Sequence, residues 1–125
     1  MRLHHRTPCK ECPWRKDSLK GYLGGWPVET YADAVAAGEV PACHLHDHGP
    51  ETDATPFCAG ALACMANQAL QPPEFHKGQQ GAKEARDTVG KLDIVFWHHS
   101  QFYEYHAGEA WVPPMLRQAM EDTMP

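Results

Sequence analysis

The sequence has no apolar run long enough to cross a membrane, and its first residues, Met1–Arg6, lack the apolar stretch of a secretion signal. We therefore expect a cytoplasmic protein without a membrane contact. The sequence also lacks a phosphate-binding loop, a paired-carboxylate motif and a recognisable nucleophile–base pair. These absences favour a binding role over a catalytic one.

The chain has five cysteines, an odd number that argues against a disulfide framework. Cys9 and Cys12 form a C-x2-C pair, and Cys43 and Cys58 follow singly, which gives C-x2-C-x30-C-x14-C. In a reducing compartment, clustered cysteines are more often metal ligands or redox groups than disulfides. We therefore predict that these four cysteines bind one inorganic centre.

The spacing bears on which centre is bound. Zinc fingers and ribbons usually join two close pairs of ligands, whereas this sequence has one close pair and two solitary cysteines. Iron–sulfur clusters are larger and take ligands from separate elements. The pattern favours a [4Fe–4S] cluster, with Zn²⁺ as the alternative. Either centre leaves a net charge of about −2 on four thiolates.

A chain of 125 residues fits one domain with a modest core, and its 10 glycines and 11 prolines indicate long loops. We predict a mainly α fold: a small irregular single domain, residues 1–125, with long loops organised by the four-cysteine site. Residues 1–26 should form a basic N-terminal loop and residues 27–125 a mainly helical body. Local patterns predict helices at about 27–38, 57–71, 83–89, 101–106 and 113–122, and leave 92–97 open between strand and helix.

The formal net charge of −5 is unevenly distributed. Residues 1–20 hold six Lys or Arg against two Asp or Glu, and the rest of the chain holds five against fourteen. Such a segment is usually a solvated surface, and the alternative is a contact with nucleic acid. The residues of this alternative are Arg2, Arg6, Lys10, Arg15, Lys16 and Lys20.

Residues around the cysteines suggest local roles. Cys58 should lie in the first turn of a helix, where unpaired N–H groups and the helix dipole favour a thiolate. Trp14 is expected to shield the centre from water, and Arg15 to pair with its negative charge. Cys64 lies six residues after Cys58, so their side chains diverge by roughly 120° on a helix. We expect Cys64 to be a buried free thiol, kept in reserve as a ligand.

Nine histidines include the cluster His44, His46 and His48, directly after Cys43. The order of these residues does not match the ligand order of metallo-β-lactamase-type hydrolases, so an enzyme site here is less favoured than a polar loop. His44 or His46 can also donate hydrogen bonds to the centre or replace a cysteine. A second cluster (His98, His99 and His106) permits a weaker metal or acid–base site, but ordinary histidines are the default.

Bulky apolar residues predict the core. The candidates are Trp26, Phe57, Phe96, Trp97, Phe102 and Trp111. Met115, Leu116, Met120 and Met124 form a stripe on the last predicted helix. This stripe is expected to face the core, with a partner-facing surface as the alternative.

Three motifs in order carry a resemblance to a family: C-x2-C-P-W-R at 9–15, Cys43-His44, and C-A-G-x-L at 58–62. This part of the chain, roughly residues 8–66, resembles an uncharacterised family of small bacterial and bacteriophage proteins. The resemblance implies that the four predicted ligands are the shared set and that Cys64 lies outside it. It also implies a phage or prophage origin, a bacterial host cell and a non-enzymatic role.

Together these observations predict a phage-type accessory protein that is built on a four-cysteine centre and binds a protein partner or, less favoured, a nucleic acid. One alternative is a redox-responsive iron–sulfur regulator. The other, less favoured, is a metal-dependent enzyme that uses His44, His46 and His48.

Overall fold

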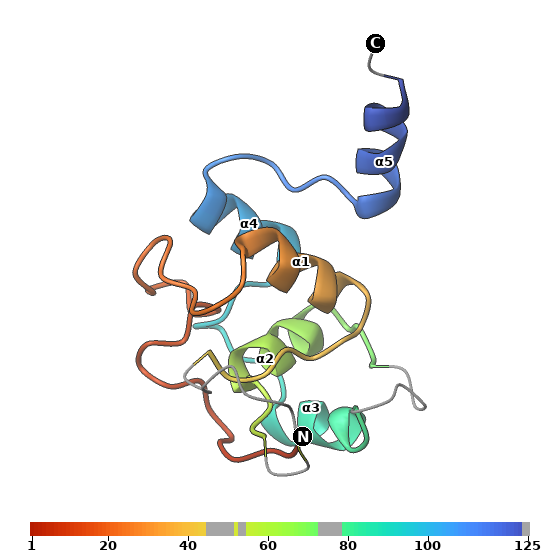
Figure 1. The fold of residues 1–125 in the computed structure, drawn as a ribbon. Helices are drawn as coiled ribbons and strands as arrows, with labels where there is room; N and C mark the ends of the chain where they lie inside the picture. Colours follow the sequence, from red (N-terminus) through yellow and green to blue (C-terminus); the bar gives the residue numbers. More distant parts are fainter. Residues whose placement is uncertain (45–51, 53–54, 73–78, 124–125) are drawn as a thin grey trace.

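A computed structural model describes residues 1–44, 52, 55–72 and 79–123. Over these residues the chain forms five helices and no strand longer than an isolated bridge (Figure 1), so the predicted mainly α fold is confirmed. No helix in this part of the chain is long and apolar enough to cross a membrane. The helices are α1 (Val28–Ala36), α2 (Ala59–Asn67), α3 (Ala82–Val89), α4 (His99–Ala107) and α5 (Pro114–Asp122).

The ends of α1 follow from local sequence, as predicted. Pro27 precedes the first turn, where its missing N–H costs nothing. Gly38 has φ +80° just beyond the last turn, and its N–H bonds to the Val35 carbonyl at 2.9 Å. The next N–H, of Glu39, bonds to the Ala34 carbonyl at 2.8 Å. This pair of bonds is a Schellman termination, which uses the left-handed conformation that glycine tolerates.

Residues 92–97 form neither the helix nor the full strand that the sequence left open. They make a short extended pairing with the segment after Cys12, through an antiparallel bridge between Arg15 and Val95. The Lys16 N–H bonds to the Ile94 carbonyl at 2.7 Å, and the Phe96 N–H bonds to the Trp14 carbonyl at 3.2 Å. The pairing ties the N-terminal loop to the body of the domain.

The core is centred on α2, in which every residue from Ala59 to Ala66 is buried. Its small side chains let other elements approach closely; α3 packs against it, and α1 packs against α4. Trp14 is fully buried and stacks on Phe102, with ring centroids 3.8 Å apart and planes inclined by 13°. The N-terminal loop therefore packs into the core through Trp14, while its basic residues Arg2, Arg6, Lys10, Lys16 and Lys20 are exposed, as expected for a solvated surface.

The prediction that the bulky aromatic residues form the core is confirmed for some of them and wrong for others. Phe57, Phe96 and Phe102 are buried, as predicted. Trp26 and Trp97 are 39% and 42% exposed, so their assignment to the core is wrong. Both lie in loops rather than on a helix face, and no periodic pattern fixes the direction of a side chain there.

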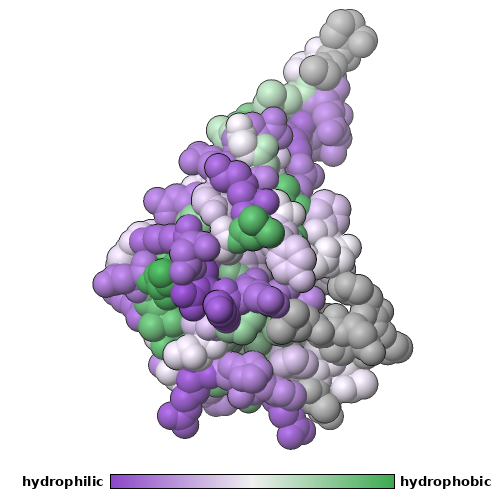
Figure 2. All heavy atoms as spheres, turned by 90° about the vertical axis from the view of Figure 1, so that its left-hand side faces the viewer, coloured by the Kyte–Doolittle hydropathy of each residue, from purple (hydrophilic) through white to green (hydrophobic). Residues whose placement is uncertain are grey.

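Helix α5 projects away from the rest of the molecule, as Figures 1 and 2 show from two directions, and none of its described residues is buried. Met115, Leu116 and Met120 are 87%, 53% and 51% exposed, so the expected core-facing stripe is wrong for these three; Met124 lies outside the described residues. The amphipathic pattern is present, but the described part of the chain leaves its apolar side exposed.

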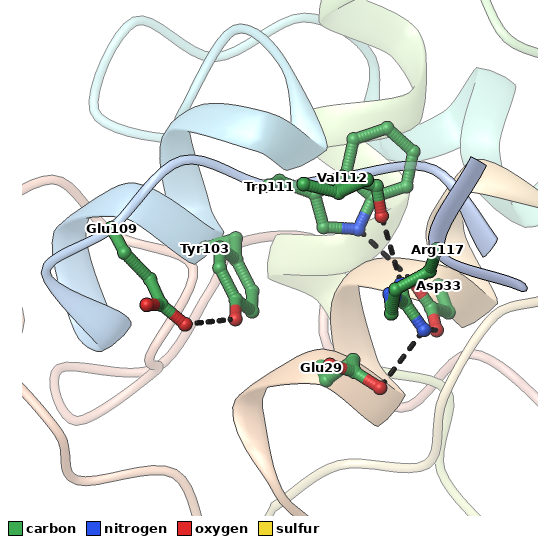
Figure 3. Close-up of polar contacts among 7 residues, drawn as sticks. All are labelled: Glu29, Asp33, Tyr103, Glu109, Trp111, Val112 and Arg117. Atoms are coloured by element: carbon green, nitrogen blue, oxygen red, sulfur yellow. Dashed lines mark hydrogen bonds and ion pairs between the residues drawn. The ribbon is translucent and has the colours of Figure 1, made fainter. Parts of the chain in front are cut away.

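A polar network attaches α5 to α1 (Figure 3). The Arg117 guanidinium donates to Asp33 at 2.8 and 3.1 Å and to Glu29 at 2.9 Å. Trp111 donates its indole N–H to the same Asp33 carboxylate at 3.0 Å. Asp33 thus accepts three hydrogen bonds from the C-terminal segment, and the position of α5 depends on polar contacts rather than on burial.

Candidate metal or cluster centre

The pair Cys9–Cys12 lies on a tight turn. The Cys12 N–H bonds to the Cys9 carbonyl at 3.1 Å, and the Arg15 N–H then bonds to the Cys12 carbonyl at the same distance. We call residues 9–15 the knuckle. These consecutive turns bring the two cysteine side chains to one side of the loop, as a C-x2-C pair requires.

Cys43 and Cys58 reach the same region through an antiparallel bridge between Ala42 and Phe57. The Cys43 N–H bonds to the Pro56 carbonyl, and the Cys58 N–H bonds to the Pro41 carbonyl, each at 3.0 Å. This reciprocal pairing places the two solitary cysteines diagonally across the bridge from each other, although 14 residues separate them in the chain. The bridge also sets the start of α2.

Cys58 is the N-cap of α2, as the sequence predicted for the helix start, and its Sγ accepts a hydrogen bond from the Ala61 N–H at 3.4 Å. The knuckle docks against the same turn. A Cβ built on Gly60 would lie 2.4 Å from Cys12 Sγ and 2.7 Å from Trp14 Cβ. Gly60 therefore leaves the space that Cys12 needs in order to reach Cys58.

The thiols affect one another's ionisation. The Cys12 and Cys58 side chains lie close enough to interact; this interaction lowers the pKa of Cys12 and, with burial, raises the pKa of Cys58 well above its ordinary value. Burial also raises the pKa of Cys9, and the charges of Cys12 and Cys43 raise it further. The Cys43 charge likewise raises the pKa of Cys58. All four predicted ligands thus interact electrostatically.

Backbone N–H groups surround the sulfurs. Glu11 donates to Cys9, and both Trp14 and Gly60 donate to Cys12, and each of these bonds lowers the pKa of the thiol that accepts it. Such donors stabilise thiolates at helix N-termini and at metal centres. Burial on its own favours the neutral thiols, and these N–H groups offset part of that effect by stabilising the negatively charged sulfurs.

The side chains do not form a complete site for a single ion. Among the residues that the structure describes, no group of three or more His, Cys, Asp or Glu side chains is arranged to hold a metal ion. The ligand set Cys9, Cys12, Cys43 and Cys58 therefore stays a prediction. What the structure adds is the interacting buried pair Cys12–Cys58. The charge of Cys12 acts on the half-buried Cys9, and the charge of the half-buried Cys43 acts on Cys58.

Cys64 is fully buried, and burial raises its pKa to about 12. Its sulfur accepts a hydrogen bond from the Gln68 side chain at 3.5 Å. None of the four predicted ligands contributes to its pKa shift, in contrast to their effects on one another. Cys64 is the buried free thiol that the sequence predicted.

Arg15 does not pair with the thiols in the way the sequence suggested. Its guanidinium forms a two-pronged ion pair with Asp17, at 2.8 and 2.9 Å. This carboxylate is close in sequence and offers two oxygens in the geometry that arginine prefers. The Arg15 charge still lowers the pKa of Cys12, so a weaker favourable effect on the site remains.

The sequence does not predict the burial of His44, for which a polar loop is the default. His44 is 7% exposed, and neither ring nitrogen has a hydrogen-bond partner among the described residues. Burial lowers its pKa, and the nearby Glu11 charge partly offsets this effect. The other members of that loop cluster, His46 and His48, lie outside the described residues.

The second histidine cluster serves the fold. His106 lies within hydrogen-bond distance of the Pro13 carbonyl at 2.7 Å through Nε2, and accepts from the Gly21 N–H at 2.9 Å through Nδ1. The His99 ring contacts Gln68 Oε1 at 3.0 Å. Both rings are thus occupied by protein partners, which supports the default reading of ordinary histidines.

These contacts define a small helical domain in which a cysteine knuckle meets the capped N-terminus of α2. Residues 4–105 match a family described as a family of unknown function (DUF6283), and the chain belongs to this family. The expected membership of an uncharacterised family is confirmed over a longer stretch than residues 8–66. The match includes all five cysteines and ends before α5. No curated protein and no solved structure matches the chain.

Proposed function

We propose that the protein is a small binding module whose fold is organised by a [4Fe–4S] cluster bound to Cys9, Cys12, Cys43 and Cys58, with Zn²⁺ as the alternative centre. The observation that carries the proposal is the meeting of the knuckle with the cap of α2. There the Cys12 and Cys58 side chains interact directly, and charge effects connect the other two thiols with them.

The residues present suit such a centre. A metal or cluster replaces the protons that these buried thiols otherwise retain, and the N–H groups of Glu11, Trp14, Gly60 and Ala61 stabilise the resulting negative sulfurs. The absence of a side chain at Gly60 gives Cys12 Sγ the space that it occupies against the first turn of α2. We favour a cluster over Zn²⁺ because a cluster takes ligands from spread segments, as the knuckle and residues 43 and 58 are.

The exposed surface supports a binding role. Met115, Leu116 and Met120 form an uncovered apolar stripe, which suits a protein partner better than water. For nucleic acid, the support is that Lys16 and Lys20 lie over the rings of Trp97 and Tyr105, at 5.4 and 5.1 Å from the centroids. We favour a protein partner. The phage or prophage accessory role rests on the family resemblance alone.

A second candidate function is a redox-responsive regulator. Cys9 and Cys43 are half-buried, whereas Cys12 and Cys58 are buried. A cluster on these four ligands would therefore have one more accessible side, and exposure is one of the factors that set the reactivity and potential of iron–sulfur clusters. Loss of the cluster would release the knuckle from α2 and alter partner binding.

Metal analysis of protein purified without oxygen tests the proposal. For a cluster we expect about four iron and four sulfide per chain and a brown protein that absorbs at about 400 nm. A colourless protein with one zinc per chain would instead support the alternative centre. Cys12→Ser should abolish uptake, and Cys64→Ser, the matched control at another buried cysteine, should retain it. Stable, folded wild-type protein that binds neither iron nor zinc would refute the proposal.

A further inference from the structure

His44 is a buried polar side chain without a partner. It is 7% exposed, and both Nδ1 and Nε2 lack a hydrogen bond to any group in the described part of the chain. Leaving a buried donor or acceptor unsatisfied costs about 1–3 kcal/mol, and native proteins contain few such groups. The comparably buried His99 has a partner in Gln68. Within the described residues, His44 therefore has a hydrogen-bonding capacity that no protein group uses.

The loop before α1 holds His44 in place. A Cβ built on Gly24 would lie 3.1 Å from His44 Cβ and 3.2 Å from its carbonyl oxygen, so residue 24 packs directly on the His44 backbone. Gly24 has φ +95°, a conformation that favours glycine. The Tyr22 ring meets the imidazole edge-on, at 6.0 Å between centroids. These contacts fix the imidazole without satisfying its nitrogens.

Two observations place His44 beside the more accessible thiols. It follows Cys43 directly in the chain, and the charge of Glu11, inside the knuckle, affects the ionisation of both Cys9 and His44. His44 is thus joined to Cys43 and shares the charged neighbour Glu11 with Cys9, and Cys9 and Cys43 are the half-buried members of the set. A centre that extends from the buried pair toward Cys9 and Cys43 extends toward His44.

We propose that His44 donates its imidazole N–H to a sulfur of the bound centre and acts as a positioning residue, not as a ligand. This inference rests on the proposed function, because the four cysteines supply the bonds to the centre. A neutral imidazole carries one N–H in either tautomer, so the role needs no change of protonation. Hydrogen bonds to sulfur tune the potential of a cluster, and groups around the ligands change metal affinity by about 10–100-fold.

The test compares His44→Leu, His44→Asn and wild type, each prepared without oxygen and analysed with and without the centre. His99→Leu is the control, because it removes an equally buried imidazole that already has a protein partner. For each protein we would measure iron and sulfide content, melting temperature, and the midpoint potential of the loaded form. If the centre is Zn²⁺, a chelator competition replaces the potential.

We expect full iron content in His44→Leu, a smaller rise in melting temperature on loading than in wild type, and a more negative potential. In the zinc form the loss should be about 10–100-fold in affinity. His44→Asn, which keeps an N–H donor, should recover part of the effect, and His99→Leu should match wild type.

The proposed role of His44 is wrong if His44→Leu has the same midpoint potential as wild type and the same rise in melting temperature on loading. Loss of iron from His44→Leu would also overturn it, by making His44 a ligand. Failure of wild type to bind any metal would instead refute the proposed function, and this inference with it.

Discussion

The sulfur of Cys12 lies where a side chain at residue 60 would begin: a Cβ built on Gly60 would be 2.4 Å from Cys12 Sγ. Trp14 Cβ lies 2.7 Å from the same point. The first turn of α2 and the knuckle therefore share a space that admits no methyl group. This fit brings Cys12 to Cys58 and makes Gly60 part of the candidate centre without being a ligand.

Gly60→Ala should destabilise the protein by about 1–3 kcal/mol, the usual cost of overpacking a core. Helix propensity alone predicts the opposite sign, a gain of about 1 kcal/mol, because alanine is the better helix former. Denaturant unfolding of the metal-free protein measures the difference. The cost should shrink in a Cys12→Ala background, where the sulfur is absent. A more stable Gly60→Ala protein would show that the knuckle does not dock as described.

Cys64 should be the slowest of the five thiols to alkylate in folded, metal-free protein. The thiolate is the reactive form, and burial raises the pKa of Cys64 to about 12 while removing it from solvent. Cys9 is half-buried and should react much earlier, although its pKa is also raised. Mass spectrometry after timed exposure to iodoacetamide at pH 8 gives the order. Equal rates at the two positions would contradict the inert, structural assignment of Cys64.

The parts of the fold that local sequence rules govern were predictable. Pro27 and Gly38 bound α1 because each satisfies or tolerates a backbone condition at a helix end. Cys58 could be assigned to the start of α2 for the same reason. The C-x2-C spacing identified the knuckle, since the turn is built within four residues.

The remainder depends on contacts between distant residues. Trp14 lies beside Cys12, but its ring also stacks on Phe102, 88 residues later, and no local pattern predicts this contact. The burial of His44 depends in part on the loop around Gly24, which no local pattern connects to Cys43. The stripe on α5 has the period of a packed helix, and a period does not tell whether the same chain supplies the surface that covers it.

The stability of the protein should fall as the pH decreases from about 6.5 to about 4, in part because of His99. Burial, and then the charge of His98, lower the pKa of His99 to about 4 from an ordinary value of 6.5. Between these two pH values the unfolded chain binds a proton that the folded chain does not. The stability of the folded state is therefore retained above this window and decreases as the pH falls through it. The effect is at most about 3.5 kcal/mol, since one pKa unit corresponds to about 1.4 kcal/mol.

Comparison of His99→Phe with wild type isolates this term. The aromatic ring keeps its contact with Trp111, whose centroid lies 4.4 Å away, but no longer titrates. The free energy of unfolding, measured by denaturant titration from pH 7 to pH 4, should decline less steeply in the variant. A substitution at the exposed His5, such as His5→Gln, is the control. An acid-side slope in His99→Phe equal to that of wild type would refute the assignment.

Arg117→Ala should detach α5 while leaving the rest of the fold intact. Arg117 connects α5 to Asp33 and Glu29 of α1, and no described residue of α5 is buried (Figure 3). Partly exposed ion pairs contribute about 0–1 kcal/mol each, so global stability should fall by roughly 2 kcal/mol at most. Amide hydrogen exchange should nevertheless accelerate strongly across residues 114–122, because a helix of nine residues is marginal when it is alone.

Met115→Ala, on the same helix at an 87% exposed position, is the control and should leave exchange in α5 nearly unchanged. Salt at 1 M should reproduce part of the Arg117→Ala effect in wild type, since it screens exposed charges beyond about 3 Å. If exchange in α5 is the same in Arg117→Ala and Met115→Ala, the polar network does not hold the helix, and the exposed apolar stripe would need another explanation.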